Sequence, residues 1–256
     1  MLDLQPSASQ SEYDEAGQYL EQEEVDESPF SESVSAIAID FDRVTNDPDK
    51  SRADEIRVLT IKNKKQPKHS KERKPPGIAV PTGGEESGET LIRAVVRETV
   101  GESGYTAGKV FGELFCEHKN HVRNNVHVFL VEADSTYVVP VKERDEVDQS
   151  YDNWITLREF FQLPYAIAKD GTPLDPNGIY YAHVRRLVKA LNSLIFADCN
   201  DPNLPPDMKE AIERLPQKAF AWTKEHAEDL LSAMEDLLKD DLIKVSENGL
   251  VVQRGE

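Results

Sequence analysis

Apolar and polar residues alternate along two segments near the start of the chain. The first covers residues 34–41 and the second, EIRVLTIKN, covers residues 55–63. Successive side chains of a strand point to opposite faces, so this alternation predicts two β-strands. The connection between them, TNDPDKSRAD (45–54), is rich in turn-forming residues and is compatible with a hairpin.

Further strands are predicted in the middle of the chain. GIAVP (77–81) reads as a short strand, and VFGELFCEHK (110–119) and NVHVFLVEA (125–133) read as two longer ones around a polar loop. Residues 135–144 predict one more strand.

Helical spacing replaces alternation toward the C-terminus. Residues 154–163 place their apolar side chains at helical intervals, and residues 178–196 form a clear amphipathic helix with basic residues opposite its apolar face. Residues 208–240 predict one or two helices. After these helices, the sequence predicts a hairpin that turns at Asn248 and Gly249.

Charge and composition divide the chain into three parts. Residues 1–33 hold ten Asp and Glu and no Lys or Arg, a composition that predicts a disordered acidic tail. Solubility is favoured as its role over autoinhibition of, or docking to, a basic surface. Residues 34–197 contain the predicted sheet and helices. The Pro- and Asp-rich segment 197–207 marks a linker, and residues 205–256 form a helical extension.

The extension and the cysteines exclude several classes of protein. Residues 205–256 carry twelve acids against seven Lys or Arg, which argues against a DNA partner and favours packing or homodimer formation. Cys116 and Cys199 form no CxxC pair, so neither a disulfide scaffold nor a structural zinc site is predicted, and both are expected to be small buried residues. The sequence shows no signal peptide and no apolar run of the ~20 residues that span a bilayer. A soluble cytoplasmic protein without a membrane partner is expected.

A basic loop precedes the most informative stretch of the chain. Residues 62–76 contain seven Lys or Arg, one His and three prolines. Two interpretations are equally favoured, namely a solvated mobile loop and an arm that attracts phosphate groups to a neighbouring site.

The stretch GGEESGETLIRAVVRETVGESGY (83–105) predicts a loop followed by a helix with Thr90 as its N-cap. Glu98 and Glu102 are four residues apart, so both carboxylates project from the same face, one turn apart. Like charges there destabilise an isolated helix, and a bound Mg²⁺ or Mn²⁺ would reverse that effect. We expect Arg97 to pair with Glu89 from the preceding loop.

The spacing of this stretch resembles the Nudix box, G-x5-E-x7-R-E-U-x-E-E-x-G-U, where U is aliphatic. The positions that match are Gly83, Glu89, Arg97, Glu98, Glu102 and Gly104. Two positions depart from the pattern. Thr99 stands where an aliphatic residue is usual, and Gly101 stands where the first glutamate of the pair belongs. The later segment with Trp154 is also similar to the family.

The resemblance implies an α/β fold, the Nudix α/β/α sandwich around a mixed sheet, over residues 34–197. It implies a pyrophosphohydrolase that cleaves a nucleoside diphosphate linked to another moiety and uses Mg²⁺ or Mn²⁺. The implied metal ligands are Glu98, Glu102 and the carbonyl of Gly83. Because Gly101 has no carboxylate, the base is sought elsewhere. The implied catalytic residues are Glu98, Glu102 and Arg97, with Glu143 and Glu146 as candidates for the base and Glu132 as a weaker one.

The nucleotide-type diphosphate substrate would be steered by Lys62, Lys64 and Lys65. Three histidines are expected to be structural rather than part of the site: His118, His121 and His127.

A second hypothesis is a Nudix-fold module with little or no activity, which binds a nucleotide or a protein partner. Gly101 favours this hypothesis. The retained Glu89, Arg97, Glu98 and Glu102 favour the enzyme.

Overall fold

The computed structural model describes residues 30–45, 47, 49–64, 75–119, 123–139, 147–168, 172–196, 209, 213–246 and 249–253, with residues 135–138 described as backbone only. The acidic segment 1–29 and the predicted linker therefore lie outside the described residues.

The central sheet is mixed, as the family resemblance implies. Its strand order is β6 (Thr82–Gly84), β1 (Ser31–Ile37), β8 (Asn124–Val138) and β7 (Tyr105–Lys119). Strand β1 runs parallel to β8 and antiparallel to β6, and β7 and β8 form a long antiparallel hairpin. Because β1 begins at Ser31, the structured domain starts three residues before the predicted boundary.

Shorter strands extend the β-structure beyond the central sheet. Strand β2 (Ile39–Asp40) pairs with β3 (Arg57–Leu59), which confirms the pairing of the two alternating segments. The connection between them contains the short helix α1 (Arg52–Glu55). Two further pairings are those of β3 with β9 (Trp154–Thr156) and of β4 (Ile61–Asn63) with β5 (Gly77–Ala79).

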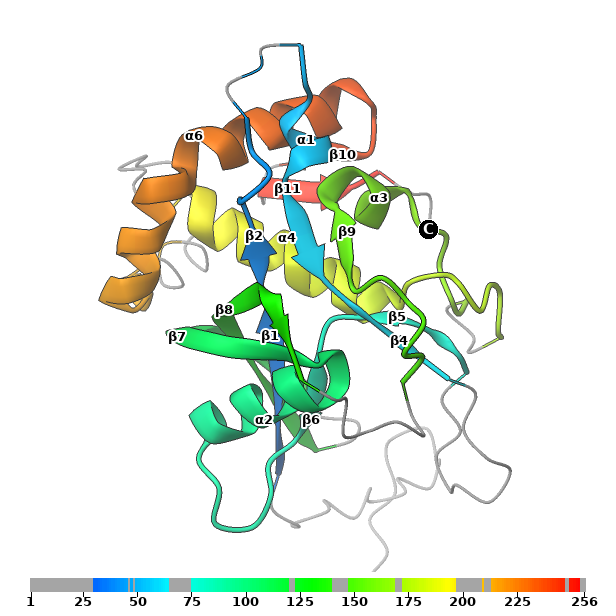
Figure 1. The fold of residues 1–256 in the computed structure, drawn as a ribbon, viewed down its shortest axis with the longest axis vertical. Coiled ribbons are helices and arrows are strands. Elements are labelled where there is room, and N and C mark those ends of the chain that lie inside the picture. The colour runs from blue at the N-terminus through cyan, green and yellow to red at the C-terminus, as the bar shows by residue number, and fades with distance from the viewer. Residues whose placement is uncertain are drawn as a thin grey trace, which may run out of the picture.

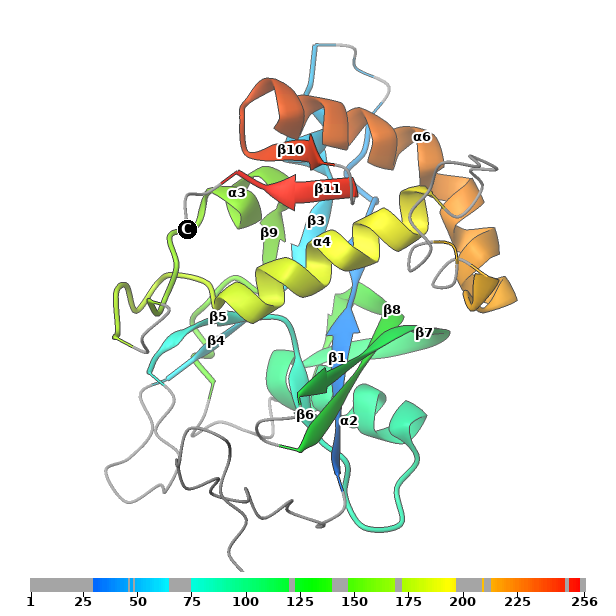
Figure 2. The same cartoon turned by 180° about the vertical axis from the view of Figure 1, so that it is seen from behind.

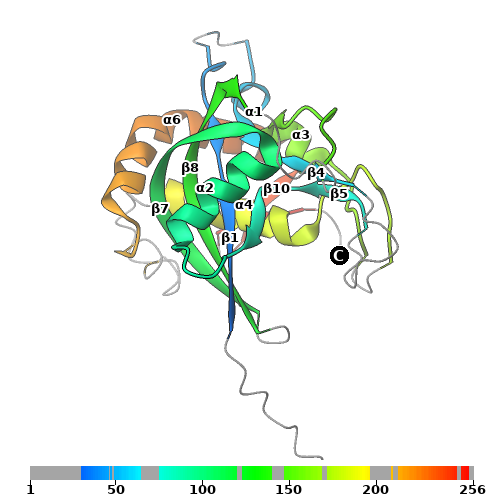
Figure 3. The same ribbon diagram turned by 60° about the horizontal axis from the view of Figure 1, so that its bottom comes forward.

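Helices cover both faces of the central sheet (Figures 1 and 2). Val34 and Ala36 of β1 pack with Ala94 and Val95 of helix α2 (Leu91–Ser103) on one face, which Figure 3 shows from below. Ile37 belongs to the larger core on the other face, where helix α4 (Tyr181–Ile195) packs against β7. The strand alternation therefore separates two apolar layers, as the sandwich requires.

The C-terminal region contributes to the larger core. Helix α6 (Gln217–Lys239) packs against α1, α4 and β7, and its Leu230 and Leu237 lie in one apolar cluster with Ile37. The hairpin of β10 (Ile243–Ser246) and β11 (Gly249–Val252) is present as predicted. Both its strands contribute to the same cluster through Ile243 and Leu250.

Two local predictions were wrong in detail. Residues 154–163 form β9 followed by helix α3 (Leu157–Gln162), which begins at a capping box between Thr156 and Glu159. The first part of the strand predicted over 135–144 is the end of β8, and residues 140–146 lie outside the described part of the chain. Among the described helices, none is long and apolar enough to cross a membrane.

Candidate active site

Helix α2 has well-defined ends that position its polar face. The Thr90 side chain accepts a hydrogen bond from the Arg93 backbone N–H at 3.4 Å, which confirms the predicted N-cap. Gly104 ends the helix in the left-handed conformation (φ 78°), which glycine adopts without steric cost. Thr99 is buried, and its hydroxyl donates to the Val95 carbonyl, so this departure from the usual aliphatic residue leaves no unpaired polar group.

The Glu98 carboxylate is buried directly against Gly83 of β6. A Cβ atom built on Gly83 would lie 2.1 Å from Glu98 Oε1, so only glycine leaves room for this carboxylate. Burial raises the pKa of Glu98, and the hydrogen bond from Arg97 offsets that effect only in part. The chain thus keeps a poorly solvated carboxylate next to the backbone of a glycine strand.

Glu102 lies one helical turn farther along and is also buried. Its Oε2 accepts a hydrogen bond of 2.8 Å from the backbone N–H of Thr82, the residue before Gly83. Both glutamates therefore contact strand β6, as their i, i+4 spacing predicts.

Arg97 connects the loop before α2 to the Glu98 carboxylate. Its guanidinium donates to Glu89 at 2.9 Å and 3.1 Å, to the Gly84 carbonyl at 2.7 Å and to Glu98 Oε1. The predicted pair of Arg97 and Glu89 is therefore present, and the hydrogen bond from Arg97 is the largest cause of the lowered pKa of Glu89. Because these contacts use several donors of its planar fork, Arg97 positions the acidic groups around it.

Gly101 is buried on the same side of the helix as the two glutamates. Residues 98, 101 and 102 of an α-helix fall within a sector of about 100°. A glutamate at position 101 would therefore add a third carboxylate to this face. Among the described residues, the one group of three or more His, Cys, Asp or Glu ligand atoms within 4.8 Å of each other lies elsewhere, at Glu113, Cys116 and His127.

The structure describes the residues before and after the segment that holds the predicted base candidates. Glu143 and Glu146 lie outside the described residues. On one side of the segment, the Val139 backbone N–H donates to the carbonyl of Gly104, the C-cap of α2. On the other side, Val147 forms a bridge to Asn63 of β4. Strand alternation places Glu132 on the face opposite Val131, which packs with α2, so Glu132 is not brought to this site.

The predicted substrate-binding lysine Lys62 contacts other side chains of the protein. Its Nζ donates to Asn177 Oδ1 at 2.8 Å and lies 3.8 Å from Asp148 Oδ2. Asp148 has a lowered pKa, mainly because Ser150 donates hydrogen bonds to it, with Lys62 and Lys64 contributing through their charge. Lys65 lies outside the described residues.

Asn153 and Thr82 hold the site together, and the sequence analysis did not identify either role. Asn153 donates to the carbonyl of Ser103 at 2.9 Å and so ties the end of α2 to the segment before β9. The Thr82 backbone holds Glu102, and its hydroxyl lies 2.8 Å from that of Ser35. No local sequence pattern marks either residue for this role.

The donor set fits a hard divalent cation. Two buried carboxylates on one helix face, next to the backbone of a glycine strand, provide the oxygen ligands that Mg²⁺ and Mn²⁺ prefer. Because the Glu98 carboxylate is poorly solvated, a nearby positive charge would stabilise its ionised form.

These features define an α/β/α sandwich in which helix α2 places acidic side chains against strand β6, which contains Gly83 and Gly84. Residues 44–176, more than half of the chain, match the family profile described as "NUDIX domain". The chain therefore belongs to the Nudix family, which confirms the resemblance of its helix α2 region.

Solved structures with a similar fold include other Nudix proteins. A NUDIX hydrolase from Nitrosomonas europaea is 15% identical, with 62% of this chain and 69% of that chain covered and a TM-score of 0.38. A MutT NUDIX hydrolase from Burkholderia pseudomallei is 22% identical (63% and 97% covered, TM-score 0.36). The NUDIX domain of Shewanella oneidensis NrtR, solved with ADP ribose, is 12% identical (64% and 87% covered, TM-score 0.41). No curated protein sequence matched, so the family assignment rests on the domain match.

Proposed function

We propose that this protein is a Nudix-type pyrophosphohydrolase, which cleaves a nucleoside diphosphate linked to another moiety. The observation that carries the proposal is the burial of the Glu98 carboxylate against Gly83, with Glu102 one turn away and bound to the Thr82 backbone. A surface pair of glutamates would be solvated and would need no glycine beside it. The cytoplasmic location expected from the sequence stays a prediction.

The residues of the site have separate proposed roles in binding the metal and in positioning its ligands. Glu98, Glu102 and the Gly83 carbonyl would hold Mg²⁺ or Mn²⁺, which supplies positive charge at the phosphoryl oxygens and lowers the pKa of bound water. Arg97 orients the Glu98 carboxylate through the hydrogen bond that it donates to Oε1.

The remaining roles belong to the two predicted loops. Glu143 or Glu146 would accept the proton of the attacking water, since Gly101 provides no carboxylate for this role. The basic segment that begins near Lys62, Lys64 and Lys65 would attract the diphosphate.

A panel assay tests the proposal with matched variants. The full-length protein is incubated with dinucleoside polyphosphates, nucleotide sugars including ADP-ribose, and nucleoside triphosphates, first with Mg²⁺ and then with Mn²⁺. We expect turnover of at least one class, and a loss of about 100-fold or more in Glu102→Gln because a carboxylate ligand is removed. Glu85→Gln makes the same chemical change at an exposed residue of the neighbouring loop and is expected to leave turnover unchanged.

The second candidate is a Nudix-fold module that binds without turnover, and Gly101 is the observation that favours it. Absence of turnover for every panel member, together with absence of Mn²⁺ binding, would support this candidate and exclude the enzyme.

The variants Gly101→Glu and Gly101→Gln distinguish an active site that lacks one acid from an active site whose geometry requires glycine at position 101. They add side chains of equal length, but only Glu adds a carboxylate. If Gly101→Glu alone raises turnover, by about 100-fold for an added general base, the wild-type site lacks an acid. If both variants lower turnover, Gly101 is needed for the geometry that the protein uses.

A further inference from the structure

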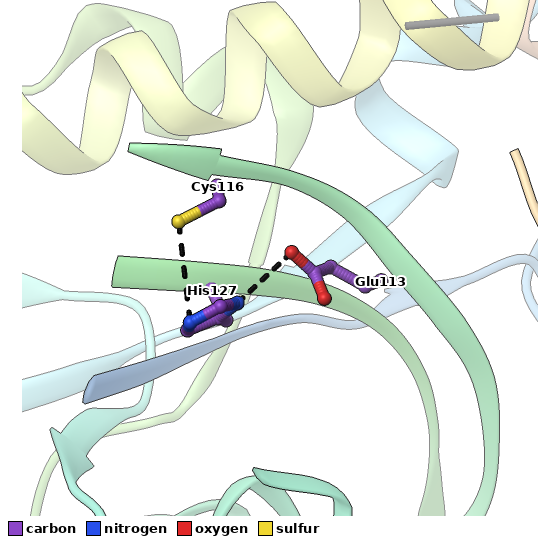
Figure 4. A group of neighbouring side chains, drawn as sticks. All are labelled: Glu113, Cys116 and His127. Carbon is purple, nitrogen blue, oxygen red and sulfur yellow. Dashed lines mark hydrogen bonds and ion pairs between the residues drawn. The ribbon is translucent and has the colours of Figure 1, made fainter. Parts of the chain in front are cut away.

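A cluster of four metal-ligating side chains lies on the central sheet, away from the glutamates of α2. It consists of Glu32 of β1, Glu113 and Cys116 of β7, and His127 of β8. Figure 4 shows that the last three converge from two adjacent strands. Ligand atoms of these three residues all lie within 4.8 Å of one another.

Sheet register explains why these residues meet. His127 is paired with Cys116 on one side and with Val34 on the other, and Glu113 is paired with Phe129. Paired residues share a face, and Val34 and Phe129 pack against α2, so the cluster lies on the α2 face of the sheet. Val34 is also paired with Gly83, so two strand spacings, or about 10 Å, separate His127 from that glycine.

The two nitrogens of His127 have different surroundings. Nδ1 lies 2.9 Å from Glu113 Oε1. Nε2 lies 2.7 Å from Glu32 Oε2 and 4.0 Å from Cys116 Sγ. The other oxygen of Glu32 accepts a hydrogen bond of 2.9 Å from Asn125, which fixes the orientation of that carboxylate.

We propose that Glu113, Cys116 and His127 bind a Zn²⁺ ion, and that Glu32 orients His127 through Nε2. Imidazole nitrogen, thiolate sulfur and carboxylate oxygen are the three protein ligand types of zinc. Mg²⁺ and Mn²⁺ prefer oxygen, so the thiol separates this site from the glutamates of α2. A carboxylate that accepts from the second nitrogen of a metal-bound histidine is the usual supporting contact.

The distances allow such an ion with a small adjustment. Zinc lies about 2.0–2.3 Å from N, O and S ligands, so ligand atoms in a tetrahedral site are about 3.3–3.8 Å apart. The ligand atoms of Glu113, Cys116 and His127 lie within 4.8 Å of one another, and Glu113 Oε1 lies 2.9 Å from His127 Nδ1. The ion takes the position among these three atoms, and the Glu113 side chain, which is 37% exposed, moves away from Nδ1 to admit it.

Metal titration of the full-length protein tests this site. Protein treated with a chelator and dialysed is titrated with Zn²⁺ against a chromophoric competitor, and Co²⁺ is used as a spectroscopic substitute. We expect one zinc ion per chain at micromolar affinity or better, and a thiolate-to-cobalt charge-transfer absorption. Cys116→Ser removes this absorption and weakens zinc binding by about 100-fold or more, whereas Cys199→Ser, the matched thiol control, changes neither.

Two further variants keep the test decisive if Cys116→Ser folds poorly. Glu113→Gln alters a partly exposed ligand side chain and is expected to weaken zinc binding by about 100-fold. Glu32→Gln, which removes the supporting carboxylate of β1, weakens it by about 10-fold. Circular dichroism confirms that both variants are folded.

Glu102→Gln separates this proposal from the proposed hydrolase activity. It is expected to retain zinc binding and the cobalt absorption, because Glu102 lies outside the cluster. Absence of zinc at stoichiometric concentration, or equal binding by wild type and Cys116→Ser, would overturn the proposal whatever the outcome of the hydrolysis assays.

Discussion

Gly83 shapes the candidate active site through the side chain that it lacks. In Gly83→Ala the new methyl group would overlap the Glu98 carboxylate, 2.1 Å away. Because a carboxylate at the end of a side chain can move, we expect unfolding free energy to fall by only about 1 kcal/mol. Mn²⁺ affinity should fall by more than about 10-fold, since Glu98 can no longer lie on β6. Urea unfolding and Mn²⁺ titration measure the two effects.

Gly84 provides the control for this variant. A Cβ atom at Gly84 meets nothing within 4 Å, so Gly84→Ala makes the same change at the next residue without a clash. Equal Mn²⁺ affinity in both variants would show that the contact of Gly83 with Glu98 is irrelevant to metal binding.

Sequence reasoning identified the residues of α2 but not those of the cluster at His127. The contact of Glu98 and Glu102 with the same strand follows from helical spacing, and the partner of Arg97 lies eight residues before it. His127 instead meets Glu32, 95 residues away, because β1 and β8 pair in parallel. No local pattern encodes that pairing, so the sequence analysis expected a structural histidine at this position.

At the scale of a single element, α1 depends on a buried carboxylate. Glu55 accepts hydrogen bonds from the side chain and backbone of Thr45, and its Oε2 lies 2.6 Å from Arg52 Nη1. Burial alone would raise the pKa of Glu55, but these hydrogen bonds outweigh burial and lower it below its ordinary value of 4.5.

The lowered pKa has a defined effect on stability. A carboxylate whose folded pKa is depressed adds stability above its unfolded pKa and loses it as pH falls through the folded pKa. Glu55→Gln should therefore lower unfolding free energy by about 1–3 kcal/mol at pH 7, and the difference should shrink below about pH 4. Urea unfolding across this range measures the effect, with the exposed Glu235→Gln as control. A difference that does not vary with pH would contradict this account.

At the scale of the whole molecule, the C-terminal residues belong to the domain. Leu230, Met234 and Leu237 of α6 are buried in the cluster that contains Ile37. Removal of residues 205–256 would expose this apolar surface, so we expect the shortened chain to aggregate or to lose cooperative unfolding. Removal of residues 1–29 serves as the control and should preserve the unfolding transition. Expression yield, size-exclusion chromatography and thermal unfolding compare the two chains.

A shortened chain that remains monomeric and unfolds cooperatively would show that residues 205–256 are a separate appendage. The sequence analysis left packing and homodimer formation open for these residues, because amphipathic periodicity identifies a helix with an apolar face but does not say which surface covers that face. The strands of the central sheet were recognised more readily, because alternating apolar and polar residues indicate a strand from local sequence alone. The covering of both faces, found at Val34 and Ile37, was implied only by the family resemblance.

The seven residues of strand β1 contact three different parts of the molecule. Glu32 reaches the cluster at His127, Val34 packs under α2 beside Gly83, and Ile37 enters the core that α6 completes. Insertion or deletion of a single residue within this strand would exchange its two faces and disturb all three parts together. During evolution, related chains are therefore expected to vary in length within their loops and to keep the length of β1 constant.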